Sequence, residues 1–318
     1  MSASAETVSG AEICRCCGAP LARHAAIESV DRLSGVPGEF NVRVCTGCGS
    51  GTTFPKVTES ELGAFYAGDY NPHEEWVPPR GLLSAISSLI RRFVSNRALR
   101  TLPLSRLAGR EGDALDVGCG RGDLGALLIA NGWRMTGVEP SPEACAIARK
   151  QGLDALAGTL GTVDLGGRSF DAITFQHSLE HVVDPAADMS IVAARLKPGG
   201  LLLVSVPNFG SLQARLFRGR WFNLDLPRHR FHYTAEGLRA LARSAGLAVE
   251  SLSTSSSPVG LPGSLTYALF GRWLFKGPVS TRVATVVSLI IYPVALLMNA
   301  FGGGDVLHMV ASKPAREP

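Results

Sequence analysis

Two pairs of cysteines near the N-terminus have the spacing of metal ligands. Cys14 and Cys17 form one Cys-x-x-Cys pair, and Cys45 and Cys48 form the other, with a glycine after each second cysteine. Four thiolates complete the tetrahedral coordination of Zn²⁺ and leave no position for water, so the spacing predicts a structural zinc site in a small ribbon. Cys16 is left as an additional thiol. A redox pair is the alternative, but no thioredoxin-like strand and helix surround these cysteines.

A glycine-rich turn is the second group of residues that could do chemistry. It runs from Asp116 to Gly122, after a predicted strand and before a predicted helix, and its glycines let the backbone approach a ligand closely. A dinucleotide-binding turn carries glycine or alanine one position later, where this chain has Asp123. Glu139 follows about twenty residues on, where a carboxylate accepts the hydroxyl protons of a ribose. Together these residues predict a nucleoside pocket, in which Asp116 would repel a diphosphate and tolerate a cation.

Alternating strand-like and helix-like segments must position these residues. Strands are predicted at 114–117, 135–138, 172–175, 201–206, 247–252 and 306–311, and helices at 124–131, 142–151, 187–196 and 234–244. This alternation predicts an α/β fold with a doubly wound, mostly parallel sheet. We expect a zinc-ribbon-like module at 1–57, a linker with a short helix at 58–81, and a main domain at 82–318.

The order of these motifs resembles the class I S-adenosylmethionine-dependent methyltransferases, which have a Rossmann-like fold. The resemblance covers roughly residues 113–256 and the final strand, and it includes the segments 170–173, 177–182 and 196–200. It implies S-adenosylmethionine as the cofactor. The binding residues that it implies are Asp116, Gly118, Cys119, Gly120 and Gly122 at the turn, Glu139 at the ribose, Thr159 and Leu160 at the adenine, and Gln176 and His177 at the methionine side.

Methyl transfer to an oxygen acceptor needs a base near the donor. Glu180 and His181 follow the strand at 172–175, where the resemblance places the acceptor side of the pocket, and His181 is the first choice for the base. Some sugar methyltransferases with an N-terminal zinc module carry a Glu-His pair in the corresponding run. The structural alternative is that His181 caps a helix or packs beneath the sheet.

A second histidine offers the same chemistry. His229 lies in the run 225–233, after the strand at 201–206, and is the alternative base. It could equally be a loop histidine that is hydrogen-bonded to the backbone. Its neighbours Arg228 and Arg230 could instead bind a phosphate of the acceptor.

A hydrophobic insertion is expected at about 258–303. Residues 283–301 include no charged side chain across nineteen positions, which is long enough to suggest a membrane span. The strand at 306–311 must return to the sheet beside 247–252, so a single crossing would put it on the wrong side of the bilayer. We expect a helical hairpin, an interfacial helix or a cap on the body, and we favour a peripheral membrane contact over a cap or a homodimer interface. A basic amphipathic helix predicted at 82–100 could join that surface.

The composition favours a folded cytoplasmic protein. The chain has 318 residues, of which 46% are hydrophobic and 18% are charged, and no secretory signal is visible at its start. A net charge of +4 and few aromatic residues between the cysteine pairs argue against a nucleic-acid partner. We expect an enzyme, peripheral to the inner face of the membrane, that methylates oxygen or carbon of a small glycosyl or lipid-linked acceptor. The alternatives are a partner-binding scaffold with a vestigial fold and a nicotinamide dehydrogenase, against which Asp123 argues.

Overall fold

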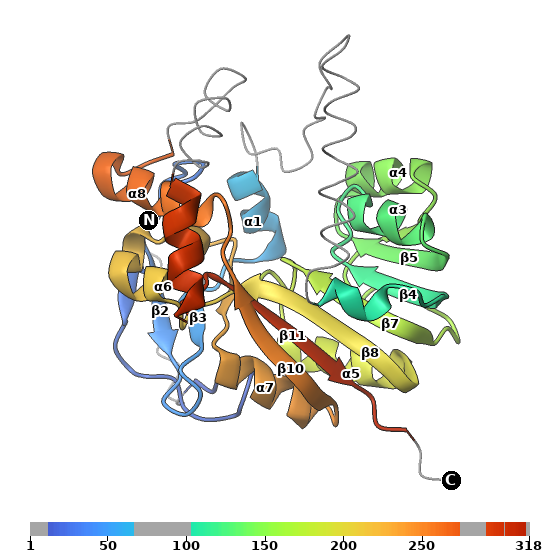
Figure 1. The fold of residues 1–318 in the computed structure, drawn as a ribbon. Coiled ribbons are helices and arrows are strands. Elements are labelled where there is room, and N and C mark those ends of the chain that lie inside the picture. Colours follow the sequence, from blue (N-terminus) through green and yellow to red (C-terminus); the bar gives the residue numbers. More distant parts are fainter. Residues whose placement is uncertain (1–11, 67–102, 274–290, 302, 316–318) are drawn as a thin grey trace.

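The structure is a computed structural model that describes residues 12–66, 103–273, 291–301 and 303–315 (Figure 1). The amphipathic helix predicted at 82–100 lies outside the described residues, and so does the first part of the uncharged run, 283–290.

A seven-stranded sheet forms the centre of the molecule, in the order β10-β11-β8-β7-β4-β5-β6 (Figure 1). Neighbouring strands from β8 to β6 pair in parallel, and β11 lies antiparallel between β8 and β10. The strands are β4 (Gly112–Val117), β5 (Trp133–Glu139), β6 (Asp154–Ala157), β7 (Phe170–Gln176), β8 (Leu196–Pro207), β10 (Ala248–Ser255) and β11 (Val306–Ser312). The predicted α/β fold with a mostly parallel sheet is confirmed. β6 is not among the predicted strands.

Helices cover both faces of this sheet. One layer holds the 3-10 helix η1 (Leu104–Leu107), α3 (Asp123–Ile129) and α4 (Pro142–Lys150), and the other holds α5 (Pro185–Arg195) and α7 (Ala235–Ser244). Successive residues of a strand point to opposite faces of the sheet. Ala114 therefore packs against the first helix layer and Leu115 against the second. The predicted cap at Thr234 is confirmed, because its side chain accepts the N–H of Gly237 at the start of α7.

A second, antiparallel sheet joins the N-terminal residues to the main domain. Its order is β1-β2-β3-β9, and its strands are β1 (Ile27–Ser29), β2 (Phe40–Val44), β3 (Gly51–Phe54) and β9 (Phe231–His232). β9 comes from the run 225–233, so the cysteine-rich module and the main domain share a sheet. The short helix predicted beyond this module is present as α1 (Glu59–Tyr66).

Short helices lie around the last strands. α6 (Leu212–Phe217), η2 (Arg218–Arg220) and η3 (Phe222–Leu224) connect β8 to β9, whereas α8 (Gly260–Phe270) and a helix at 291–300 lie between β10 and β11. Within the described ranges, no helix has both the length and the apolar character needed to cross a bilayer. The expected contact with a membrane surface stays a prediction.

Candidate active site

The glycine-rich turn lies at the carboxyl end of β4, in the middle of the main sheet. Gly118 adopts a φ of +73°, and a Cβ built on it would lie 2.4 Å from the Cβ of Ser178. A side chain is therefore excluded at this position by the backbone conformation and by the segment that follows β7. The N–H of Gly118 also donates to the carbonyl of Val138 at 2.7 Å, which holds the turn against the end of β5. The bare backbone thus lies where open α/β sheets bind their ligands.

Two carboxylates flank this turn. Glu139 ends β5, and its Oε2 accepts the N–H of Gly120 while its Oε1 accepts the N–H of Ser141, both at 3.0 Å. Asp116 is buried and accepts a hydrogen bond from the hydroxyl of Thr174 at 2.6 Å. Burial and the charge of Glu139 together outweigh the hydrogen bond from Thr174 and raise the pKa of Asp116 to about 6. Two acids at one turn suit a cationic ligand better than an anionic one.

The other predicted cofactor residues follow the neighbouring strand ends. Thr159 and Leu160 come directly after β6, and the Leu160 side chain is buried. Gln176 ends β7, and its Nε2 is buried without a hydrogen-bond partner among the described residues. His177 follows with a φ of +53°, and its side chain is 52% exposed. The structure therefore gathers these residues at the carboxyl ends of β4 to β7, and Cys119, Gly120 and Gly122 lie in the turn itself.

Three histidines surround one buried carboxylate beside β7. The Glu180 side chain is 1% exposed, and its Oε1 lies 3.6 Å from Nδ1 of His177 and 4.0 Å from Nε2 of His229. Donor atoms of Glu180, His181 and His229 all lie within 4.8 Å of one another, so this set could also hold a divalent cation. Burial by itself would raise the pKa of Glu180, but the close approach of His177 and the charges of the three histidines lower it to about 2. The carboxylate can therefore stabilise a positive charge on its neighbours.

The two predicted bases lie side by side with the same tautomer. Nδ1 of His181 lies 3.0 Å from the carbonyl oxygen of Arg228, and Nδ1 of His229 lies 2.9 Å from that of Asn223. A carbonyl can only accept, so in both neutral rings Nδ1 carries the proton and Nε2 keeps its lone pair. The rings pack edge to face with centroids 4.7 Å apart. Burial, and then the charge of His181, lower the pKa of His229 to about 4, so His229 is neutral at pH 7.

Arg228 does not have the predicted role as a phosphate ligand. Its side chain is fully buried, and Nη2 lies 2.7 Å from Asp31 and 2.6 Å from Asp225. Nη1 donates to the carbonyl of Phe65 at 2.9 Å. A guanidinium that is paired twice and excluded from solvent cannot reach an acceptor. The expectation is wrong for Arg228 because residues far away in the sequence, Asp31 and Phe65, fold over it.

Further residues in contact with the histidines lie on elements that sequence reasoning left aside. The hydroxyl of Tyr66, at the end of α1, lies 3.3 Å from Nδ1 of His181. The hydroxyl of Thr53, on β3, donates to the carbonyl of His229 at 2.6 Å and lies 2.9 Å from Nε2 of His232. The sequence signal for His232 is its position three residues after His229. Tyr66 and Thr53 show no pattern in the sequence that points to this site.

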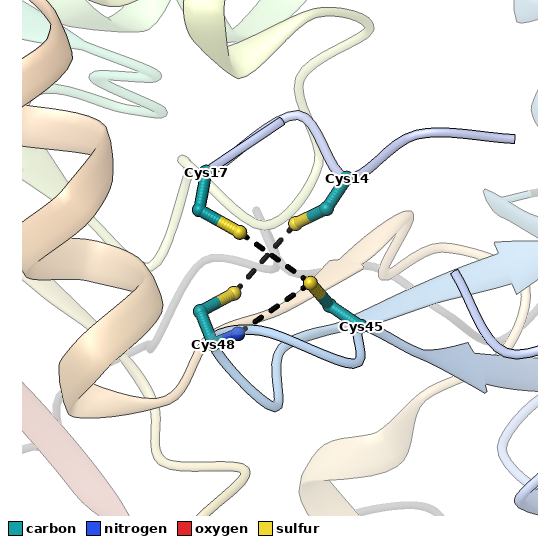
Figure 2. Close-up of side chains that lie close together, drawn as sticks. All are labelled: Cys14, Cys17, Cys45 and Cys48. Carbon is teal, nitrogen blue, oxygen red and sulfur yellow. Dashed lines mark hydrogen bonds between the residues drawn. The ribbon is translucent and has the colours of Figure 1, made fainter. Parts of the chain in front are cut away.

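The four predicted zinc ligands converge on one point. Figure 2 shows the thiols of Cys14, Cys17, Cys45 and Cys48 directed toward a common centre. All four sulfurs lie within 4.8 Å of one another. The Sγ atoms of Cys14 and Cys48 are 3.7 Å apart, and those of Cys17 and Cys45 are 3.4 Å apart. Four sulfurs at Zn–S distances of about 2.3 Å would be separated by about 3.8 Å, so the residues fit a tetrahedral zinc ion.

Backbone amides also direct their protons toward these sulfurs. Sγ of Cys45 accepts the N–H groups of Gly47 and Cys48 at 3.4 and 3.5 Å, and Sγ of Cys14 accepts the N–H of Cys16 at 3.3 Å. Such bonds favour the thiolate form that a metal requires. The Cys16 thiol is buried and is not part of the four-sulfur set.

Comparisons with known proteins bear on both the fold and the activity. The family described as a methyltransferase domain matches residues 89–252, slightly more than half of the chain. The chain is 32% identical to a ubiquinone biosynthesis O-methyltransferase of Xylella fastidiosa (strain 9a5c) over 212 residues, which covers 61% of this chain and 80% of that relative. It is also 32% identical over 189 residues to the protein of that name from Xanthomonas euvesicatoria pv. vesicatoria (strain 85-10), with coverages of 55% and 75%.

Solved structures of methyltransferases overlap with the chain as well. One, from Thermotoga maritima, is described as a possible histamine N-methyltransferase and is 22% identical, with a TM-score of 0.46 and coverages of 72% and 95%. Another S-adenosylmethionine-dependent methyltransferase, from Archaeoglobus fulgidus, is 18% identical, with a TM-score of 0.47 and coverages of 73% and 100%. The strand order and pairing described above, and not these overlaps, define the architecture of this chain.

Proposed function

The chain belongs to the S-adenosylmethionine-dependent methyltransferases, and from that premise we propose that it methylates a hydroxyl oxygen of a small lipophilic acceptor, with His181 as the base. The observation that supports this proposal best is the arrangement of His181 beside Glu180. The imidazole has a lone pair on Nε2, its Nδ1 is bonded to the Arg228 carbonyl, and a buried carboxylate lies next to it. Two adjacent groups with these properties suit proton removal from a weak acid.

The cofactor would be held along the carboxyl ends of β4 to β7. In this proposal Glu139 accepts the ribose hydroxyls, the turn from Gly118 to Gly122 approaches the nucleoside, and Asp116 attracts the positive end. Thr159 and Leu160 would flank the adenine, and Gln176 and His177 would face the methionine. Bound there, S-adenosylmethionine supplies an electrophilic methyl group on a positively charged sulfur.

The side chains around Glu180 would then handle the proton of the acceptor. His181 accepts the hydroxyl proton at Nε2, which makes the acceptor oxygen nucleophilic. The imidazolium that forms is stabilised by the ionised Glu180, and its Nδ1–H stays bonded to the Arg228 carbonyl. His229 keeps an uncharged ring against His181, so it adds no repulsion to the new charge. The positioning of these groups before the acceptor arrives reduces the cost of reorganisation.

An oxygen acceptor is favoured over a carbon acceptor by the relatives, which are named ubiquinone biosynthesis O-methyltransferases. The pathway in that name leads to ubiquinone, a lipophilic quinone, and we therefore favour a lipid-linked acceptor over a glycosyl one. We disfavour a vestigial, non-catalytic fold because the bare glycine turn and Glu139 lie together at the ends of neighbouring strands.

The test combines product identification with paired variants. Cell metabolites are incubated with the protein and methyl-labelled S-adenosylmethionine, and mass spectrometry identifies the labelled product and its methylated atom. His181→Gln is expected to lower kcat by about a hundredfold or more, because general-base catalysis contributes on that scale. Affinity for S-adenosylmethionine, measured by calorimetry, should stay close to the wild-type value. Full activity of His181→Gln would rule out His181 as the base, and a labelled carbon would rule out the oxygen acceptor.

The set Glu180, His181 and His229 supports a second mechanism, in which a divalent cation helps to bind the acceptor. The two mechanisms differ in their response to metal. With proton transfer to His181 alone, chelator-treated protein regains full activity with one equivalent of Zn²⁺, which the four cysteines would hold. With a cation at the histidines, full activity requires a second equivalent of divalent metal.

A further inference from the structure

Exposed apolar side chains are concentrated on one part of the surface. Of the twelve large hydrophobic side chains exposed in the described ranges, nine belong to α6, the segment of α8 with Val259 before it, and residues 291–301. We call this set the apolar face. It includes Leu216, Leu269 and Phe301, which are 67%, 74% and 83% exposed. Single exposed hydrophobic residues are ordinary, but a contiguous group on a soluble surface marks an interaction site.

The three segments of the apolar face are neighbours in space. α6 packs against α8, and a Cβ built on Gly303, just after the helix at 291–300, would lie 3.1 Å from Cβ of Leu212 on α6. The hydroxyl of Ser256, just before α8, donates to the carbonyl of Ala295 within that helix at 2.6 Å. Figure 1 shows α6, α8 and this red helix together at one end of the molecule, on the opposite side from α3 and α4. The exposed side chains therefore belong to one surface.

Basic side chains lie on and beside the segments of the apolar face. Arg215, Arg218, Arg220 and Arg272 are exposed on or beside α6 and α8. Residues 206–224, 256–273 and 291–304 contain no aspartate or glutamate. A second copy of the chain that docked through the same face would bring these arginines against one another, because such a contact is symmetric. Acidic lipid headgroups would complement the arginines while the apolar side chains enter the acyl boundary.

We propose that the apolar face docks on the surface of an anionic lipid bilayer. The helices would lie in the interface without crossing it, which accords with their length. This inference does not require the proposed methyl acceptor, and its test does not use activity.

The same contact would bring the acceptor side of the active site close to the bilayer. α8 packs against η3, where the rings of Tyr267 and Phe222 lie 5.5 Å apart. The next residue on η3, Asn223, binds Nδ1 of His229 through its carbonyl. A chain of direct contacts thus connects the apolar face to the predicted bases, so docking through this face would place His229 close to the bilayer.

The test is flotation of the full chain with vesicles. We expect the protein to float with vesicles rich in phosphatidylglycerol, to bind vesicles of pure phosphatidylcholine much less, and to dissociate as salt is raised, because the arginines contribute electrostatically. No flotation with the anionic vesicles at low salt would overturn the proposal.

Variants separate the apolar face from other exposed hydrophobic residues. The triple variant Leu216→Ser, Leu269→Ser, Phe301→Ser is expected to lose about tenfold in vesicle partitioning, since it removes three side chains that would enter the interface. The matched control is Ile13→Ser, Val30→Ser, Val183→Ser, which replaces the three exposed large hydrophobic residues outside the face and should bind as the wild type does. Circular dichroism and affinity for S-adenosylmethionine, measured on both variants, establish whether each is folded.

Two outcomes would contradict a lipid surface as the occupant. Equal losses in the two triple variants would mean that the face has no special role. A dimer in light scattering that the Leu216, Leu269 and Phe301 substitutions convert to a monomer, without vesicle binding by the wild type, would assign the face to a second copy of the chain.

Discussion

At the scale of single residues, burial alone does not decide the charge of an acid. Asp116 and Glu180 are both buried, yet the pKa of Asp116 is raised to about 6 and that of Glu180 is lowered to about 2. Burial dominates at Asp116, which has one hydroxyl donor and a nearby acid. Glu180 faces three histidines, whose proximity and charges outweigh the same penalty. Neighbours therefore distinguish an acid that can gain a proton from one that stays ionised.

The raised pKa of Asp116 predicts that cofactor binding depends on pH. As pH falls through about 6, Asp116 becomes neutral and its attraction for a cationic ligand is lost. Affinity for S-adenosylmethionine should then decrease by about fivefold between pH 7.5 and pH 5, since such an interaction is worth ~1 kcal/mol. Calorimetry at both pH values measures the change, and Asp116→Asn should remove most of it. An equally steep change in Asp116→Asn would assign the pH dependence to another group.

The clash at Gly118 predicts a loss of cofactor binding that backbone strain alone would not cause. In Gly118→Ala the new Cβ would lie 2.4 Å from the Cβ of Ser178, so the turn must move and affinity should fall by about tenfold or more. Gly109→Ala is the matched control, because Gly109 has nearly the same φ, +72°, with nothing within 4 Å. The control should cost ~1 kcal/mol of stability and leave affinity unchanged. Similar affinities in the two variants would contradict this account of the turn.

At the scale of elements, the cysteine cluster holds the strand that carries the acceptor-side loop. Cys48 accepts the hydroxyl of Thr234 through its carbonyl at 2.7 Å. β3 begins three residues after Cys48 and pairs with β9, which follows His229. Thr53 on β3 then donates to the His229 carbonyl. The position of His229 therefore depends on a strand that begins three residues after a predicted zinc ligand.

Removal of one ligand should release both the metal and this loop. Cys45→Ser is expected to lose the one equivalent of zinc that mass spectrometry of the wild type should detect, because three thiolates hold the ion far less tightly. Amide hydrogen exchange should become faster in β3 and β9, a readout that does not depend on activity. Cys16→Ala removes a buried thiol outside the four-sulfur set and should keep the metal. Loss of zinc from Cys16→Ala, or unchanged exchange in Cys45→Ser, would contradict the assignment.

At the scale of the whole molecule, one buried cation ties the N-terminal residues to the main domain. Arg228 pairs with Asp31 from the first module and with Asp225 from its own loop. Asp31 also accepts the backbone N–H groups of Leu33, Ser34 and Val36. The two parts share a sheet and an ion-pair network, so their unfolding should be coupled.

Asp31→Ala should therefore destabilise the whole molecule by about 3 kcal/mol, because it leaves a buried guanidinium short of a partner. Urea unfolding followed by fluorescence measures the change in the free energy of unfolding. Asp31→Asn should lose less stability than Asp31→Ala, since its amide oxygen can still accept hydrogen bonds. The control is Glu236→Ala, which breaks the exposed pair with Arg239 and should cost less than ~1 kcal/mol. Equal effects of Asp31→Ala and Glu236→Ala would show that the buried network does not couple the two parts.

Much of the cofactor side could be predicted from the sequence because its signals are local. The strand at Gly112–Val117, the bare turn after it and the carboxylate that ends the next strand lie close together in the chain. The four predicted zinc ligands show the same property, since each pair lies within one tight turn. Such patterns depend on backbone geometry and side-chain period, which adjacent residues determine.

The acceptor side depended on the tertiary structure. Tyr66, Glu180, His181 and His229 come together only when α1, the segment after β7 and the loop before β9 pack side by side. Whether Arg228 reaches a phosphate or an aspartate is equally decided by residues almost two hundred positions away. Burial, hydrogen-bond partners and hence pKa values are properties of packing between distant segments, and no local pattern of residues encodes them.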